Sequence, residues 1–368
     1  MQRFPIDGRE IGPGAPTFIV AEAGINHQGD REMALELIRA ADEAGADAIK
    51  FQKRSLDRIL TRSGLAMPYE HANSFGRTYG EHKAALELSE DDWHALRDAA
   101  EDRGLFFFAS VWDEESADFC ADLGAPLFKI ASADVTNLPL LLHVARKNRP
   151  VFVSTGMSDL DEIDNVVRVL RAAGTPHVLL QCTSTYPTRD ADVNLRAMEL
   201  LRSRYGCPVG YSGHESGIEI SLAAVALGAC VIERHLTIDK TLKGGDHAAS
   251  LEPDELARMV RGIRRIEAAL GSPQKRCLPA ERTVRRKLAK SLVTTTAITP
   301  GQRIEEWMLT TKGPGTGFSP DRIGEIVGRI ASRSIPEDVV LTDDDLIPTL
   351  GDAYVARVTG RRFVVGLN

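Results

Sequence analysis

The chain has 368 residues, enough for one large α/β domain and a small second domain. It is 43% hydrophobic and 26% charged with a net charge of −7, which argues against a general nucleic-acid-binding or membrane-surface role. The five cysteines show no C-x-x-C spacing, which argues against a disulfide framework or thiolate zinc site and favours the cytoplasm. We expect no signal peptide and no membrane span, because the N-terminus lacks an apolar core and no run approaches about 18 apolar residues.

Short apolar runs alternate with helical patterns along the first 270 residues. The predicted strands span 18–22, 48–52, 105–110, 127–131, 151–155, 178–183, 208–212 and 231–236. The predicted helices span 29–44, 89–104, 114–123, 138–147, 160–173, 195–205, 216–229 and 253–270. Because the strands are continuous apolar runs, we expect them to be parallel and buried on both faces. Eight such units in about 250 residues predict an α/β fold of the (β/α)8 TIM-barrel type.

A doubly wound sheet is the alternative, but it needs a glycine-rich phosphate loop after its first strand, where this chain has E-A-G-I-N-H. We assign residues 1–272 to the barrel, 273–290 to a basic linker and 291–351 to a small β-rich domain with Pro/Gly turns. The tail, 352–368, is predicted to hold a hairpin around residues 359 and 360, with no assigned role. The long polar insertion at 53–88 is of the kind that is usually functional or mobile.

In a barrel of this kind the active site lies at the carboxyl ends of the strands. The polar residues at these ends are Glu22, Lys50, Gln52, Ser110, Lys129, Ser132, Ser154, Thr155, Thr183, Ser184, Ser212, His214, Glu233 and His235. Two lysines and several hydroxyls supply the charge and the directed donors that a phosphate group requires. Glu22, Asp134 and the two histidines indicate in addition a divalent metal and acid–base chemistry.

His214 and His235 follow two strands that are separated by one helix, so these strands are expected to be parallel. If the two strands are neighbours they lie about 5 Å apart, and two imidazoles at that spacing can share one metal ion. The alternative for this pair is two histidines with a purely structural role. For Lys50 or Lys129 taken alone, the alternative is a solvated side chain without a function. His214 is not part of an H-E-x-x-H motif, because Ile218 stands where the second histidine belongs.

A series of longer motifs then becomes recognisable. In chain order these are A-E-A-G-I-N-H, A-I-K-F-Q, F-K-I-A-S-A-D, S-T-G-M, Q-C-T-S-T-Y-P, V-G-Y-S-G-H-E, V-I-E-R-H-L-T-I-D-K and D-H-A-A-S-L-E-P. Through them the chain resembles the sialic acid (nonulosonic acid) synthases, a barrel followed by an antifreeze-like SAF domain, over nearly its whole length. Through F-G-R-T-Y-G-E-H-K it is most similar to the animal-type members of that family.

The resemblance implies an enzyme that condenses phosphoenolpyruvate with an open-chain hexosamine, such as N-acetylmannosamine or its 6-phosphate. It implies a divalent metal held by His214 and His235, namely Mn²⁺, with Mg²⁺ or Co²⁺ as alternatives. The residues implied to hold phosphoenolpyruvate are Lys50, Ser110, Lys129, Ser132, Ser154, Ser184 and Ser212. Those implied to act on the sugar or the reacting carbons are Glu22, Gln52, Asp134, Tyr186 and Asp246. A domain-swapped homodimer, in which the SAF domain of one chain caps the barrel of the other, is implied as well.

The chain departs from the family pattern in the SAF loop, where Gly313 stands in place of an arginine that reaches the N-acyl group in many bacterial members. Mannose or its 6-phosphate, giving KDN, is therefore an alternative acceptor, as are the sugars of the legionaminic and pseudaminic types. A Schiff-base aldolase with Lys129 or Lys50 as nucleophile is an alternative of another class. A non-catalytic binding protein is a third, which intact Glu22, His214 and His235 argue against.

Overall fold

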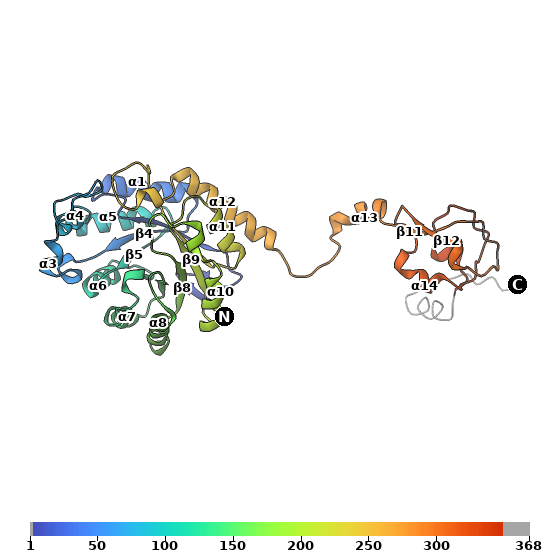
Figure 1. The fold of residues 1–368 in the computed structure, drawn as a ribbon, viewed down its shortest axis with the longest axis horizontal. Coiled ribbons are helices and arrows are strands. Elements are labelled where there is room, and N and C mark those ends of the chain that lie inside the picture. Colours follow the sequence, from blue (N-terminus) through green and yellow to red (C-terminus); the bar gives the residue numbers. More distant parts are fainter. Residues whose placement is uncertain (1–2, 349–368) are drawn as a thin grey trace. The chain divides into compact units, whose positions relative to one another are not determined.

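The computed structural model describes residues 3–348, and the chain divides after Gly271 into two compact units that are described separately below (Figure 1). The predicted tail hairpin around residues 359 and 360 lies outside the described residues. No helix in this described part is long and apolar enough to cross a membrane.

Eight parallel strands close into a barrel in the first unit, which confirms the predicted fold class. The strands are β3 (Phe18–Gly24), β4 (Ala48–Lys53), β5 (Phe106–Val111), β6 (Phe128–Ile130), β7 (Val151–Ser154), β8 (His177–Cys182), β9 (Val209–Gly213) and β10 (Val231–His235). They pair in chain order, and β10 closes the ring on β3. The strands β9 and β10 are paired neighbours, as the metal-pair prediction requires.

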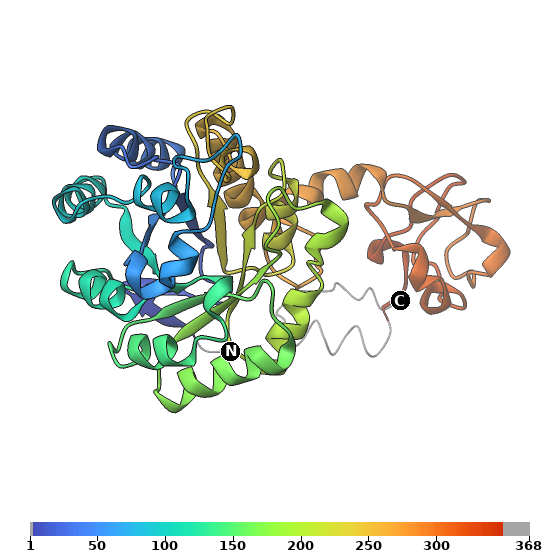
Figure 2. The same ribbon diagram turned by 60° about the vertical axis from the view of Figure 1, so that its left-hand side comes forward.

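A ring of helices surrounds these strands, as Figure 2 shows. The main helices are α1 (Arg31–Ala44), α5 (Glu90–Glu101), α6 (Glu114–Asp122), α7 (Leu138–Ala145), α8 (Leu160–Ala172), α10 (Ala197–Tyr205), α11 (Glu219–Ala226) and α12 (Pro253–Leu270), with a further short turn α9 (Asp190–Val193). The start of α1 follows from its cap, because the Asp30 side chain accepts hydrogen bonds from the amides of Glu32 and Met33. The prediction of a helix over 216–229 was too long. Gly217 has a φ of 76°, a left-handed conformation that cannot continue a helix, so α11 begins only at Glu219.

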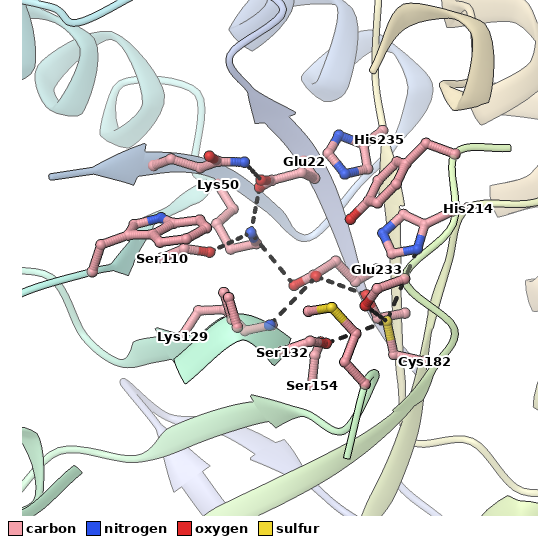
Figure 3. A pocket seen from close by; sticks show the side chains of 18 residues that line it. Glu22, Lys50, Ser110, Lys129, Ser132, Ser154, Cys182, His214, Glu233 and His235 are labelled. Carbon is pink, nitrogen blue, oxygen red and sulfur yellow. Dashed lines mark hydrogen bonds and ion pairs between the residues drawn. The ribbon is translucent and has the colours of Figure 1, made fainter. Parts of the chain in front are cut away.

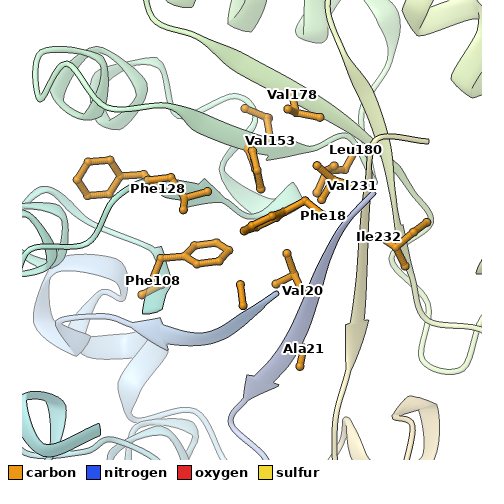
Figure 4. Close-up of a cluster of buried hydrophobic side chains, with 14 of the residues drawn as sticks. Phe18, Val20, Ala21, Phe108, Phe128, Val153, Val178, Leu180, Val231 and Ile232 are labelled. Atoms are coloured by element: carbon orange, nitrogen blue, oxygen red, sulfur yellow. The ribbon is translucent and has the colours of Figure 1, made fainter. Parts of the chain in front are cut away.

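The floor of the barrel is a layer of apolar side chains inside the ring of strands, among them Phe18, Phe108 and Val20 (Figure 4). The Phe152 ring contacts Phe18 and Phe108 edge to face, with ring centroids 6.0 and 6.2 Å apart. Side chains two residues further along a strand point the same way, so Phe18 is followed inward by Val20 and then Glu22. This alternation places a polar layer on top of the apolar floor, at the carboxyl ends of the strands. An N-terminal hairpin that the sequence did not predict, β1 (Phe4–Ile6) with β2 (Arg9–Ile11), adds buried isoleucines to the same core.

The insertion at 53–88 is not a structureless loop. It contains the short helices α2 (Leu56–Ile59), α3 (Arg62–Leu65) and α4 (Tyr79–Ala84), the last with a capping box at Thr78. The buried His82 ring packs against Tyr69, with ring centroids 4.6 Å apart, and its Nδ1 accepts a hydrogen bond from the Phe75 amide. His82 therefore holds the insertion together through packing.

The second unit has its own apolar core, centred on residues such as Leu292, Ile298 and Leu341. It begins with α13 (Arg282–Leu288) and contains an antiparallel pair, β11 (Ser291–Thr294) with β12 (Leu309–Lys312), and the short helix α14 (Ile323–Ile326). Short strands separated by Pro/Gly turns were predicted here. Within residues 272–348 only that one pair is regular, and the remaining pairings are single bridges such as Ile298 with Ile335. The frequent turns leave too few consecutive residues for longer ladders.

Candidate active site

One cavity at the mouth of the barrel brings together all the residues that were given a role in the site except Asp134 and Asp246 (Figure 3). The strand-end hydroxyls of Thr155 and Thr183 donate to backbone carbonyls and do not line it. The cavity has a volume of about 190 Å³. The predicted residues that line it are Glu22, Lys50, Gln52, Ser110, Lys129, Ser132, Ser154, Ser184, Tyr186, Ser212, His214 and His235. They come from consecutive strands and strand–helix loops, so closure of the barrel is what assembles them.

Two lysines and two carboxylates form a buried charge cluster at the base of the cavity. Lys50 Nζ lies 2.5 Å from Glu22 Oε2 and 3.8 Å from Glu233 Oε2. Lys129 Nζ lies 3.8 Å from Glu233 Oε1 and donates a hydrogen bond to the Ile130 carbonyl. All four side chains are buried, so two amino groups and two carboxyl groups face one another away from solvent.

Burial and mutual attraction shift these groups in opposite directions. Burial raises the pKa of Glu22 to about 7, although the Lys50 charge opposes the shift. Burial alone would also raise the pKa of Glu233, but Lys129 and Lys50 together hold it below its ordinary value. The pKa of Lys129 is lowered because its ammonium is desolvated. Strongly perturbed groups that converge in one cavity are typical of a functional site.

Several hydroxyls lie beside the lysines, and a glycine allows their loops to approach. Ser110 Oγ accepts a hydrogen bond from Lys50 Nζ at 2.8 Å. Ser132 Oγ accepts one from the Gly156 amide at 3.0 Å. A Cβ atom at Gly156 would lie 2.9 Å from Ser132 Oγ and still closer to Ser184 Oγ, so any larger residue would displace this pair. Ser154 Oγ is buried and has no hydrogen-bond partner among residues 3–348, which leaves it available to a ligand.

The two histidines face each other across β9 and β10, with ring centroids 5.4 Å apart. His214 Nδ1 lies 2.9 Å from the Thr183 carbonyl, an arrangement in which Nδ1 carries the proton and Nε2 keeps a free lone pair. His235 Nδ1 is buried without a hydrogen-bond partner in the described part of the chain. Burial lowers the pKa of His235 to about 4, so its ring is neutral at pH 7. Tyr186 packs on His214 with ring centroids 4.1 Å apart and closes this side of the cavity.

The two predicted residues outside the cavity lining differ in their position. Asp246 Oδ2 lies 3.9 Å from His235 Nδ1, so it borders the site beside this histidine. Asp134 follows β6 in a 3-10 turn, and its Oδ1 accepts a hydrogen bond from Asn137. Burial raises the pKa of Asp134. Its expected orientation toward the reacting carbons stays a prediction, because its observed contact is with the following helix.

The cavity contains residues to which sequence reasoning gave no role. Glu233 is the most important, since it contacts both lysines and accepts a hydrogen bond from Ser212 Oγ at 3.0 Å. Its position two residues before His235 was a sufficient signal, because alternate residues of a strand share a face. Cys182, Trp112 and Met157 also line the cavity. Cys182 Sγ lies 3.6 Å from Ser132 Oγ, and its inward direction follows from the parity of β8.

Comparison with known proteins assigns this architecture to a family. Residues 37–275 match the model of the NeuB family, and residues 289–347 match that of the SAF domain. This chain belongs to the NeuB family. The matched NeuB segment begins after β3, so Glu22 lies outside it, although it completes the cavity.

Known relatives match this chain over most of its length. The N-acetylneuraminate-9-phosphate synthase of Homo sapiens is 45% identical over 92% of this chain and 94% of the human protein. The N,N'-diacetyllegionaminic acid synthase of Legionella pneumophila is 40% identical over 90% of this chain and 94% of that protein. The solved structure of a Leptospira borgpetersenii N-acetylneuraminic acid synthetase is 36% identical, covers 77% of this chain and 95% of that chain, and has a TM-score of 0.66. The chain is therefore an enzyme of the sialic acid (nonulosonate) synthase type.

Proposed function

We propose that this enzyme condenses phosphoenolpyruvate with open-chain N-acetylmannosamine 6-phosphate to give a nine-carbon sialic acid 9-phosphate and inorganic phosphate. The observation that carries the proposal is the cavity in which a lysine–hydroxyl cluster lies beside the imidazoles of His214 and His235. The first group suits a phosphate, and the second suits activation of a carbonyl. The identity to the human 9-phosphate synthase favours the 6-phosphorylated acceptor over the free sugar.

The lysine–hydroxyl cluster is the proposed site for phosphoenolpyruvate. Lys50 and Lys129 supply two positive charges, and Ser154 Oγ supplies a free donor. In the reaction, C3 of phosphoenolpyruvate bonds to the aldehyde carbon of the sugar, and water adds at C2. The C2–O bond to phosphate then breaks, so that one water is consumed and one phosphate released. The lysines balance the charge that grows on the leaving phosphate.

The sugar is proposed to bind on the side of the cavity formed by Glu22, Gln52 and Tyr186. Gln52 Nε2 donates a hydrogen bond to Glu22 Oε1 at 3.1 Å, which orients this carboxylate toward the cavity. Glu22 lines the cavity and pairs with Lys50, whereas Glu233 lies between Lys50 and Lys129. We therefore assign to Glu22 the removal of a proton from the water that adds at C2. Asp246, beside His235, is proposed to contact sugar hydroxyls.

The histidine pair fits a divalent metal ion, which we propose to be Mn²⁺, with Mg²⁺ or Co²⁺ as alternatives. The free lone pair of His214 and the unpartnered buried Nδ1 of His235 are suitable donors. Within the described residues no group of three or more His, Cys, Asp or Glu side chains could hold a metal, so water or substrate oxygens would complete its coordination. Such an ion, when bound, polarises an aldehyde oxygen as a Lewis acid.

A phosphate-release assay tests the proposal. Purified protein is incubated with phosphoenolpyruvate, Mn²⁺ and one sugar at a time: mannose, N-acetylmannosamine, and the 6-phosphate of each. We expect the fastest release with N-acetylmannosamine 6-phosphate. Equal rates with and without the 6-phosphate would contradict the phosphorylated acceptor, and preference for the mannose sugars would support the KDN alternative. No release with any sugar, together with borohydride trapping of pyruvate on the protein, would overturn the synthase in favour of a Schiff-base aldolase.

Two further parts of the proposal concern the state of the protein. We infer a homodimer in which the SAF domain of one chain caps the barrel of its partner, on the basis of family membership. Light scattering on the purified protein measures the mass directly, and a monomer would contradict this inference. We also propose a cytoplasmic location, which the five free cysteines support.

A further inference from the structure

A buried ion pair lies directly behind the two histidines, on the outer face of the barrel. Glu215 follows His214 in the chain, and Arg234 precedes His235. Arg234 Nη1 lies 2.8 Å from Glu215 Oε1, and both side chains are 0% exposed. Because neighbouring residues of a strand face opposite sides, the pair points away from the cavity while the histidines line it.

The Arg234 guanidinium connects the ends of β9 and β10 through several bonds. Nη1 also donates to the Gly217 carbonyl and to Ser221 Oγ, both at 2.9 Å. Nη2 donates to the backbone carbonyl of Glu215 itself. The second oxygen of Glu215, Oε2, accepts a hydrogen bond from the Tyr211 hydroxyl at 2.6 Å. One side chain on β10 thus binds the backbone on either side of the turn that follows His214.

The same ion pair explains why position 213 requires a glycine. Gly213 is the register partner of Arg234 in the ladder between β9 and β10. A Cβ atom at Gly213 would lie 2.5 Å from Glu215 Oε2 and 2.6 Å from Tyr211 Cε1, so only glycine leaves room for the hydrogen-bonded carboxylate. In the G-H-E and E-R-H motifs, the residues next to each histidine therefore belong to one buried network.

This network is a poor source of net stability. A buried ion pair often contributes no more than apolar residues of the same volume, because both charges lose their hydration. Arg234 Nε is in addition buried without a hydrogen-bond partner in the part of the chain that the structure describes, which is a further cost. The geometry is nevertheless specific, since a planar guanidinium accepts only a few arrangements of its partners.

We propose that the Glu215–Arg234 pair positions His214 and His235 relative to each other and thereby sets the affinity of the site for its divalent metal. The pair acts through the backbone: it fixes the turn after His214 to the strand that carries His235. It touches neither metal nor substrate, so its two members are positioning residues. The proposal rests on the metal site proposed above and goes beyond it by assigning a role to residues outside the cavity.

The test compares variants of the full-length protein by direct Mn²⁺ binding, with electron paramagnetic resonance of the free ion as the readout. The decisive variant is the double substitution Glu215→Leu with Arg234→Met, because an apolar pair of similar volume preserves folding. We expect it to unfold close to the wild-type temperature, to bind phosphoenolpyruvate normally without metal, and to bind Mn²⁺ about 10- to 100-fold more weakly. Arg234→Lys, which keeps the charge but not the planar fork, is expected to fall between the double variant and the wild type.

A control variant separates loss of metal affinity from general destabilisation. Arg264 forms a half-buried cluster at the opposite end of the barrel, with Nη2 2.9 Å from Asp47 Oδ2 and Nη1 donating to the Thr17 carbonyl. Arg264→Met is expected to reduce stability without changing the Mn²⁺ affinity. A folded double variant with wild-type Mn²⁺ affinity would overturn the positioning role. Absence of Mn²⁺ binding by the wild-type protein would instead refute the metal site itself, and the positioning role with it.

Discussion

The substitution Lys129→Met tests the phosphate site, because it removes one charge and keeps most of the length of the unbranched side chain. Lys129 is 2% exposed, and its Nζ lies 3.8 Å from Glu233 Oε1. At that distance two unit charges attract by about 4 kcal/mol at an effective dielectric constant of about 20. Glu233 keeps Lys50 and Ser212 as partners after the change. We therefore expect the unfolding free energy to fall by about 3 kcal/mol, which is the lower end of the range for breaking a buried ion pair.

The catalytic effect of Lys129→Met follows from the bond that Lys129 is proposed to make with phosphoenolpyruvate. A hydrogen bond to a charged group is worth about 1.5–3 kcal/mol, which corresponds to a fall in kcat/KM for phosphoenolpyruvate of about 10- to 150-fold. Phosphate release at varied phosphoenolpyruvate and saturating sugar measures it, and urea unfolding measures the stability.

The matched control for this experiment is Lys53→Met. Lys53 lies on β4, but it packs outside the barrel over Phe119, with Nζ 5.0 Å from the ring centroid. We expect this variant to keep the wild-type kcat/KM. A folded Lys129→Met protein with unchanged kcat/KM would refute the phosphate site as drawn here, and so would an equal loss in the two variants.

Three further predictions concern other parts of the barrel. His235→Ala should remain folded while losing Mn²⁺ binding and nearly all activity, as measured by metal titration and phosphate release; activity retained without metal would refute its role. Gly156→Ala should displace the hydroxyls of Ser132 and Ser184 and raise KM for phosphoenolpyruvate while leaving the fold intact, and an unchanged KM would show that these hydroxyls do not bind it. Burial lowers the pKa of His27 from 6.5 to about 4. As the pH falls, the unfolded chain therefore binds a proton on His27 before the folded chain does. The stability contributed by neutral His27 is complete above pH 6.5 and is lost as the pH falls toward 4. At about 1.4 kcal/mol per pH unit, this loss of unfolding free energy amounts to about 3 kcal/mol between pH 7 and pH 4. Urea unfolding at the two pH values measures it, and His27→Gln should lose about 3 kcal/mol less than the wild type. An equal loss in the two proteins would show that His27 does not cause it.

The order of strands and helices was predictable because it depends on local pattern. Continuous apolar runs identified the parallel strands, and capping residues such as Asp30 and Gly45 marked the ends of α1 correctly. Once the strand number indicated a barrel, the carboxyl ends of the strands identified most of the cavity lining without further information. His214 and His235 were found in this way, because strands joined by one helix are usually neighbours.

What the sequence determined by itself was therefore the fold, the face of the barrel that carries the site, and the kinds of groups present there. Only the tertiary structure decided which of these groups meet. Glu233 lies between two lysines from distant strands, Asp134 contacts Asn137 instead of lining the cavity, and Arg234 secures the turn after His214. The physical reason is that contacts across a closed barrel depend on strand register and tilt, which arise from the packing of the whole ring and leave no local signal in the chain.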